Sequence, residues 1–112
     1  MNPSILITVK KLIGIHEDDE SFDMDLLIHI NAALNALSQL GVGPSDGFII
    51  MDKDGQWSDL LLGNQMLEMA KSYVCLYTRK AFDPPQSSTA MEALNSVLAE
   101  LTFRISVQVE AE

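Results

Sequence analysis

Two consecutive prolines, Pro84 and Pro85, constrain this chain more than any other feature of its sequence. A proline has no backbone N–H to donate, and it pushes the residue before it out of helical backbone, so no helix can pass through the pair. The apolar helical pattern that carries Tyr73 and Tyr77 must therefore end by about Asp83. A stiff elbow between two long helices is an architectural feature rather than a catalytic one.

A second helix is predicted directly after the prolines. Thr89 is a favourable N-cap residue, and Glu92 three residues later completes a capping box. Five apolar residues then recur at helical spacing, which predicts one buried stripe along a helix of about 89–108. They are Met91, Leu94, Leu98, Leu101 and Ile105.

The N-terminal half predicts two more helices. The first runs over about 4–13, with Ser4 near its N-cap and Gly14 as its stop. The second begins near Ser21, whose hydroxyl can cap it, and ends at Gly41. Its apolar residues predict a buried stripe at helical spacing. They are Leu26, Ile30, Ala33, Leu34, Leu37 and Leu40.

The middle of the chain has a different pattern. Residues 44–57 contain a short, partly β-branched apolar run followed by an Asp-Gly turn signal, so both a hairpin and an extended loop fit. A third long helix is predicted over about 59–82, with Ser58 as its cap. Gly63 weakens that helix, so we expect an irregular first turn.

Length and composition are those of one globular domain. The chain has 112 residues, of which 47% are hydrophobic, enough for a core. We expect a single all-α domain over residues 1–112: a small bundle of four main helices with a protruding middle loop or short β-hairpin. The lone cysteine, Cys75, lies in an apolar helical pattern, which favours a buried, inert thiol. No segment is typical of a signal peptide or a membrane span.

The charge is acidic and unevenly distributed. A net charge of −9 argues against binding to the nucleic-acid backbone, which requires clustered Lys and Arg. Between Lys11 and Lys71 there are eleven acidic residues and a single base, Lys53. This asymmetry allows head-to-tail contacts between copies, acidic face to basic face. The alternative is that the acidic surface only keeps the protein soluble.

No catalytic, cofactor-binding or metal-binding constellation is predicted. Residues 52–55 match part of a calcium loop, but Leu61 stands where its bidentate acid is required. His16 and His29 are not at metal-ligand spacing. No phosphate loop, dinucleotide fingerprint or nucleophile elbow occurs. We therefore expect a protein that is not an enzyme.

Two large aromatic side chains, Phe48 and Trp57, fall in the predicted loop region. They can fill the helical core, which is the commoner case. They can instead anchor a neighbouring subunit, because aromatic residues are enriched at binding hot spots. Both interpretations stay open at the level of sequence.

Several short segments, from residue 5 to about 108, occur in a characteristic order. Segment 77–85 contains the Asp83-Pro84-Pro85 string, and segment 93–104 lies in the predicted helix after it. The segments are 8–15, 22–23, 28–31, 40–44, 77–85 and 93–104. In this order and spacing they resemble the small head–tail connector (adaptor) proteins of long-tailed bacteriophages.

The resemblance implies a structural virion protein at the capsid–tail junction, made in the cytoplasm of the bacterial host. Such connectors assemble into rings, commonly dodecameric, beneath the portal. They extend the channel through which DNA passes and dock the next head-completion or tail protein. The implied partners are other copies of the chain, the portal protein and that next protein. DNA would pass without specific binding, and no membrane or cofactor is implied.

Two sets of residues are candidates for these roles. An acidic lining repels DNA phosphates, so acids in segment 17–25 and around the middle loop are candidates for the channel or its rim. Ring closure needs two different surfaces on each subunit. The interface candidates are Phe48 and Trp57 on one side, and Arg79, Lys80 and Arg104 on the other. The channel candidates are Glu17, Asp18, Asp19, Glu20, Asp52 and Asp54, with Asp46 and Asp59 nearby.

An acidic helical module of a different kind also fits the residues. A small dimeric adaptor or an antitoxin-like regulator would form a closed oligomer and have no affinity for a portal protein.

Overall fold

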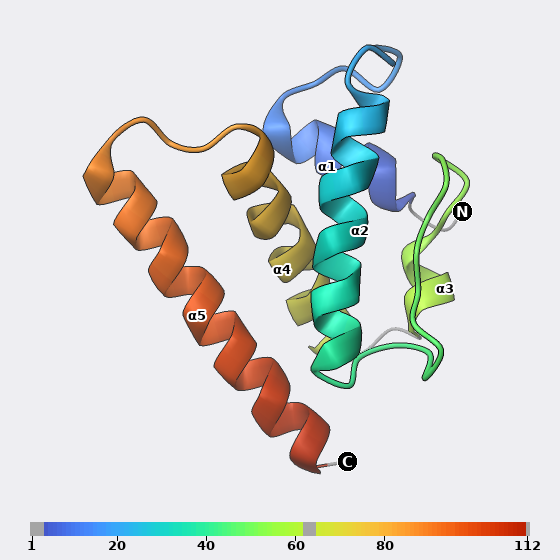
Figure 1. The fold of residues 1–112 in the computed structure, drawn as a ribbon, viewed down its shortest axis with the longest axis vertical. Helices are drawn as coiled ribbons and strands as arrows, with labels where there is room; N and C mark the ends of the chain where they lie inside the picture. The colour runs from blue at the N-terminus through green and yellow to red at the C-terminus, as the bar shows by residue number, and fades with distance from the viewer. Residues whose placement is uncertain (1–3, 62–64, 112) are drawn as a thin grey trace.

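The computed structural model describes residues 4–61 and 65–111 and consists of α-helices joined by loops (Figure 1). Within these residues there is no strand, so the predicted all-α fold is confirmed. α4 is the central helix, and α1, α2 and α5 each pack against it. The body is flattened, with extents of 39 × 36 × 22 Å. The helices are α1 (Ile5–Ile13), α2 (Asp23–Gln39), α3 (Trp57–Leu60), α4 (Gln65–Phe82) and α5 (Ser88–Ala111).

The ends of α1 agree with the prediction. The Ser4 hydroxyl accepts a hydrogen bond from the Ile7 N–H at 3.2 Å, so Ser4 is the N-cap. Gly14 ends the helix with φ at +94°, a left-handed conformation that a residue without a Cβ adopts readily. The sequence signals at both ends are local, which explains why they were sufficient here.

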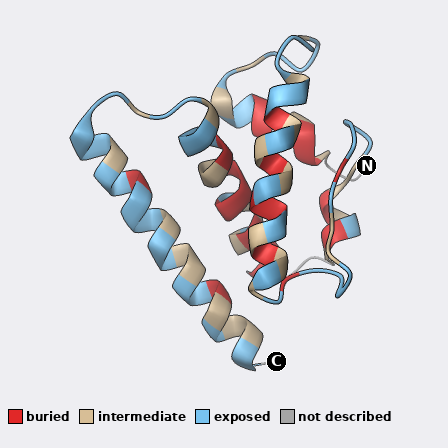
Figure 2. Ribbon diagram, viewed as in Figure 1, coloured by how far each residue is buried: buried red, intermediate tan, exposed pale blue. Residues whose placement is uncertain are grey.

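The core lies where α1, α2 and α4 meet (Figure 2). Five of the six residues in the stripe predicted for α2 are fully buried, and Leu40, just beyond the helix, is half-buried. α5 differs from the other long helices, because only Leu94 and Ile105 of its residues are buried. The rest of its predicted stripe is half-buried, and Leu98 and Leu101 of it pack against the core.

Two predicted caps are wrong. The Ser21 hydroxyl donates to the Asp19 carboxylate at 2.6 Å, and α2 begins after Phe22 without a side-chain cap. At α5 the Ala90 N–H donates to the Ser87 hydroxyl at 3.0 Å, so Ser87 caps this helix and Thr89 lies inside it. Asp19 competes with the α2 backbone for the Ser21 hydroxyl, and Ser87 takes the place of Thr89 as the acceptor at the start of α5.

The long helix predicted over 59–82 is two helices. Leu61 is extended, with φ at −165° and ψ at 159°, and this separates the short α3 from α4. α3 begins before the predicted Ser58 cap, because the Gln56 N–H donates to the Asp59 carboxylate at 3.1 Å. The irregular turn predicted at Gly63 lies outside the described residues.

The middle segment, residues 44–56, is an extended loop and not a hairpin. Its one β-bridge joins Gln56 to Ser4 at the start of the chain. The Asn31 side chain holds the centre of the segment, because its amide donates to the Ile50 carbonyl and accepts from the Ile50 N–H, both at 2.9 Å. The Ile5 N–H donates to the Gly55 carbonyl at 3.0 Å. The segment is therefore tied to α1 and α2 along its length.

Candidate assembly surfaces

The loop between α1 and α2 carries the first group of predicted channel acids. The Lys10 side chain, which is 1% exposed, holds this loop in place. Its ammonium group donates to the Glu17 carbonyl at 3.0 Å and to the Asp23 carboxylate at 2.8 Å. Two hydrogen bonds from Ser21 keep the pKa of the Asp19 carboxyl below its usual range. Asp19 is half-buried and the other three acids of the group are exposed. The four acids are Glu17, Asp18, Asp19 and Glu20.

The second group of predicted channel acids, Asp52 and Asp54, lies in the middle segment and is exposed. The Asp52 carboxylate accepts the Asp54 N–H at 2.8 Å, which shapes the turn. Glu20 of the loop and Met51 of the segment line one hollow, whereas Asp52 and Asp54 do not line it. The predicted channel acids therefore lie on two separate loops, and Glu20 is the one of them at this hollow.

The structure places the predicted interface residues in two different environments. Trp57 is 1% exposed, and its indole N–H donates to the Thr8 hydroxyl at 3.1 Å. Phe48 is half-buried against the core. These rings therefore hold the middle segment onto the domain, and the segment's outer surface is formed by other side chains.

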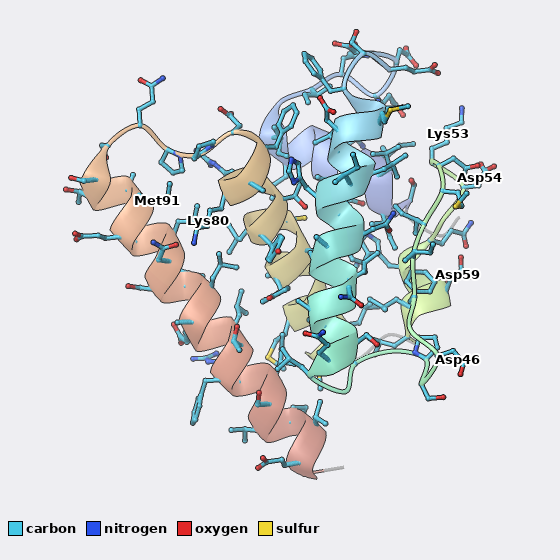
Figure 3. All side chains as sticks on the ribbon, viewed as in Figure 1. Asp46, Lys53, Asp54, Asp59, Lys80 and Met91 are labelled. Atoms are coloured by element: carbon cyan, nitrogen blue, oxygen red, sulfur yellow. The ribbon has the colours of Figure 1, made fainter. Side chains whose placement is uncertain are left out.

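The predicted basic residues are all exposed. Arg79 and Lys80 occupy the last turn of α4, and Arg104 on α5 pairs with Glu100 at 2.7 Å. Figure 3 shows Lys80 between α4 and α5, whereas Asp54 and its neighbours follow the edge formed by the middle segment. The structure does not bring the basic and aromatic candidates together. It places them on opposite sides of the molecule.

Sequence reasoning missed the exposed apolar side chains of the middle segment. Phe48 and Ile50 face the core, whereas Ile49 and Met51 are 61% and 78% exposed. Successive side chains of an extended strand point to opposite sides, so clamping Ile50 inward turns its neighbours outward. The sequence shows only a continuous apolar run over residues 48–51, so it does not show which of these side chains face the core.

A groove of about 410 Å³ lies between α4 and α5. Tyr73 and Tyr77, whose ring centroids are 5.8 Å apart, form part of its wall. Burial raises the pKa of the Tyr73 hydroxyl, and the neighbouring Tyr77 adds to the effect. The other main lining residues are Lys80 of α4 and Leu98, Ala99 and Thr102 of α5.

The described residues contain no group of three or more His, Cys, Asp or Glu side chains placed to hold a metal ion. Cys75 is buried, and burial raises the pKa of its thiol to about 11, so it is a thiol and not a thiolate at neutral pH. Over the same part of the chain, none of the helices has the length and apolar character needed to cross a membrane.

A family model described as phage connector protein matches residues 5–112. A search of curated proteins and a search of solved structures found no match. The family match spans nearly the whole chain and confirms the resemblance described above. This chain therefore belongs to the phage connector protein family, a family of structural components of the phage particle.

Proposed function

We propose that this protein is a head–tail connector that forms a ring beneath the portal. The ring extends the DNA channel and provides the platform for the next head-completion or tail protein. The observation that carries this proposal is the family match over residues 5–112. The ring size, commonly dodecameric in connectors, and the identity of both partners are part of the proposal.

The shape of the subunit supports a ring. The middle segment and α5 lie on opposite sides of a flattened body (Figure 1), and α5 forms one wall of the groove. When two different surfaces of one chain bind each other, the contact is heterologous and repeats around a ring. Of the three predicted basic residues, Lys80 lines the groove, whereas Arg79 and Arg104 do not. Under this proposal Lys80 belongs to one surface, and Phe48 and Trp57 act by holding the middle segment that forms the other.

The acids on the two loops are proposed to face the channel or its rim. Negative side chains repel DNA phosphates, so the DNA passes through the channel without binding to it. Replacing the exposed acids of the loop between α1 and α2 by their amides should leave ring formation intact and slow DNA ejection. Neutralising Glu92 and Glu110 on α5 is the control. Unchanged ejection in the loop variant would remove these acids from the channel. The acids replaced are Glu17, Asp18 and Glu20.

The proposed function is tested by the mass of the purified protein, alone and mixed with the portal protein of the same phage. A ring that forms spontaneously or only on the portal is the expected result. A stable dimer that ignores the portal would overturn the proposal and favour the small dimeric adaptor. Light scattering gives the mass, and electron microscopy shows whether the assembly is closed.

A further inference from the structure

We propose that the apolar pair Ile49 and Met51 of one copy docks into the α4–α5 groove of the next copy. This inference rests on the proposed ring and names the two surfaces that join its subunits. Neither surface is used inside the protomer, because the pair points to solvent and the groove is open.

The apolar pair is held in place before any partner binds. The Asn31 side chain forms hydrogen bonds with the backbone N–H and carbonyl of Ile50, the residue between Ile49 and Met51. The Ile5 N–H ties the far end of the segment to α1 through the Gly55 carbonyl. A segment that is already ordered loses little conformational entropy on binding, so apolar contact made by the pair converts efficiently into affinity.

The groove has the chemistry to receive such a pair. Its floor is aromatic and aliphatic, from Tyr73, Tyr77 and Leu98. The Thr102 hydroxyl already donates to the Leu98 carbonyl at 2.9 Å, so an apolar guest leaves it satisfied. A volume of about 410 Å³ is within the range of pockets that accept compact apolar groups.

Charge distinguishes a second copy from other occupants. Lys80 is the one charged side chain among the described residues that line the groove, and it is exposed and makes no ion pair with them. The middle segment carries Asp46, Asp52 and Asp54 against a single base, Lys53. An apolar pair flanked by carboxylates therefore complements an apolar groove flanked by an ammonium group.

The two surfaces cannot meet within one subunit. Figure 3 shows Lys80 on the α5 side of the molecule and Lys53 and Asp54 on the opposite edge. Each copy can therefore give its segment to one neighbour and receive a segment from the other. Such a contact leads to a closed ring or an open filament, and it excludes a two-fold dimer that uses both surfaces at once.

A cysteine pair tests the contact directly. In the variant Met51→Cys with Ala99→Cys, one thiol sits on the segment and the other lines the groove. The native Cys75 is buried and stays out of the reaction. Rings assembled on the portal and oxidised should give a ladder of linked copies on a non-reducing gel. The control pair Ala32→Cys with Ala99→Cys, which moves one thiol to an exposed position on α2, should give at least about tenfold less linked product.

The outcomes separate this contact from the ring itself. Rings visible by electron microscopy without a ladder above the control would overturn the docking contact and leave the connector function standing. If the unaltered protein forms no ring with or without the portal, the proposed function falls and the contact with it. A ladder confined to the Met51 and Ala99 pair supports both.

Charge reversal is the second test. Lys80→Glu should raise the concentration needed for assembly by about tenfold, and adding Asp54→Lys should restore much of the loss. Arg79→Glu is the matched control, since it makes the same charge change on the same helical turn outside the groove. Equal effects of the two reversals would mean that net charge, and not this contact, governs assembly.

Discussion

Lys10 is an ammonium group inside the protein, held between α1 and the first turn of α2. Its partners are the Asp23 carboxylate at 2.8 Å and the Glu17 carbonyl at 3.0 Å. Burying a charge is costly unless its partners replace the lost water. The pair therefore decides where the acidic loop begins and how closely it follows α1.

Removing the carboxylate should be more damaging than removing an equivalent one nearby. Asp23→Ala leaves Lys10 unpaired, and because Asp23 is partly exposed we expect the free energy of unfolding to fall by about 2–3 kcal/mol. Asp25→Ala, in the same helical turn but exposed, should cost less than about 1 kcal/mol. Urea denaturation measures both. Equal losses would show that the helix dipole, and not the buried pair, is responsible.

At the scale of the element, α5 is the helix least committed to the protomer. It has 24 residues, yet only Leu94 and Ile105 are buried, and Phe103 and Val107 on its outer surface are exposed. Figure 2 shows this contrast with α2 and α4, whose inner faces are buried. A helix with one covered face and apolar residues elsewhere is suited to contact with another subunit.

The start of α5 offers a test that separates two neighbouring hydroxyls. Ser87→Ala removes the cap of the helix and should lower the free energy of unfolding by about 1 kcal/mol. Thr89→Ala lies inside the exposed first turn and should change it by no more than about 0.5 kcal/mol. Thermal unfolding of the two variants and of the unaltered protein measures both changes in stability. A larger effect at Thr89 would restore the cap that the sequence predicted.

At the scale of the whole molecule, two electrostatic effects oppose each other. Copies of a chain with net charge −9 repel, whereas the proposed contact between Lys80 and the middle segment of a neighbour would attract. The sixteen acidic residues outnumber the seven Lys and Arg, so repulsion dominates at long range. Salt screens long-range repulsion while apolar contact is retained. The balance therefore favours assembly as ionic strength rises from low to physiological values.

This expectation is checked by light scattering of the purified protein across a salt series. Assembly should begin at a lower protein concentration in physiological salt than in low salt. Lys80→Glu, with two more negative units per copy, should need more salt to assemble than Arg104→Gln, which loses one positive unit. Rings that fall apart as salt is added would show that ion pairs hold them together.

Much of the fold was predictable because its signals are local. The cap and stop of α1 and the buried stripe of α2 each depend on residues within a few turns of one another. The pair Pro84 and Pro85 likewise separates α4 from α5 without help from the rest of the chain. Periodicity and capping are properties of neighbours in sequence, so they can be read without a structure.

The family resemblance was also readable, since it rests on the order of segments. The break at Leu61 was not, because Gly63 indicated only a weakened first turn and no local rule places an extended residue at Leu61. The two caps were misplaced because a sequence does not show which neighbouring polar group a hydroxyl will meet: the Ser21 hydroxyl donates to Asp19 instead of capping α2, and Ser87 rather than Thr89 caps α5.

The sequence by itself determined the helical class of the protein, the position of its proline elbow and its acidic character. Only the tertiary structure decided which aromatic and apolar side chains face outward. The buried Trp57 side chain forms a hydrogen bond with Thr8, 49 positions away. The Asn31 side chain forms a hydrogen bond with the backbone of Ile50, 19 positions away, and holds Ile50 toward the core. Contacts between residues so distant in sequence leave no local pattern, and they alone place Ile49 and Met51 on the surface where a second copy can reach them.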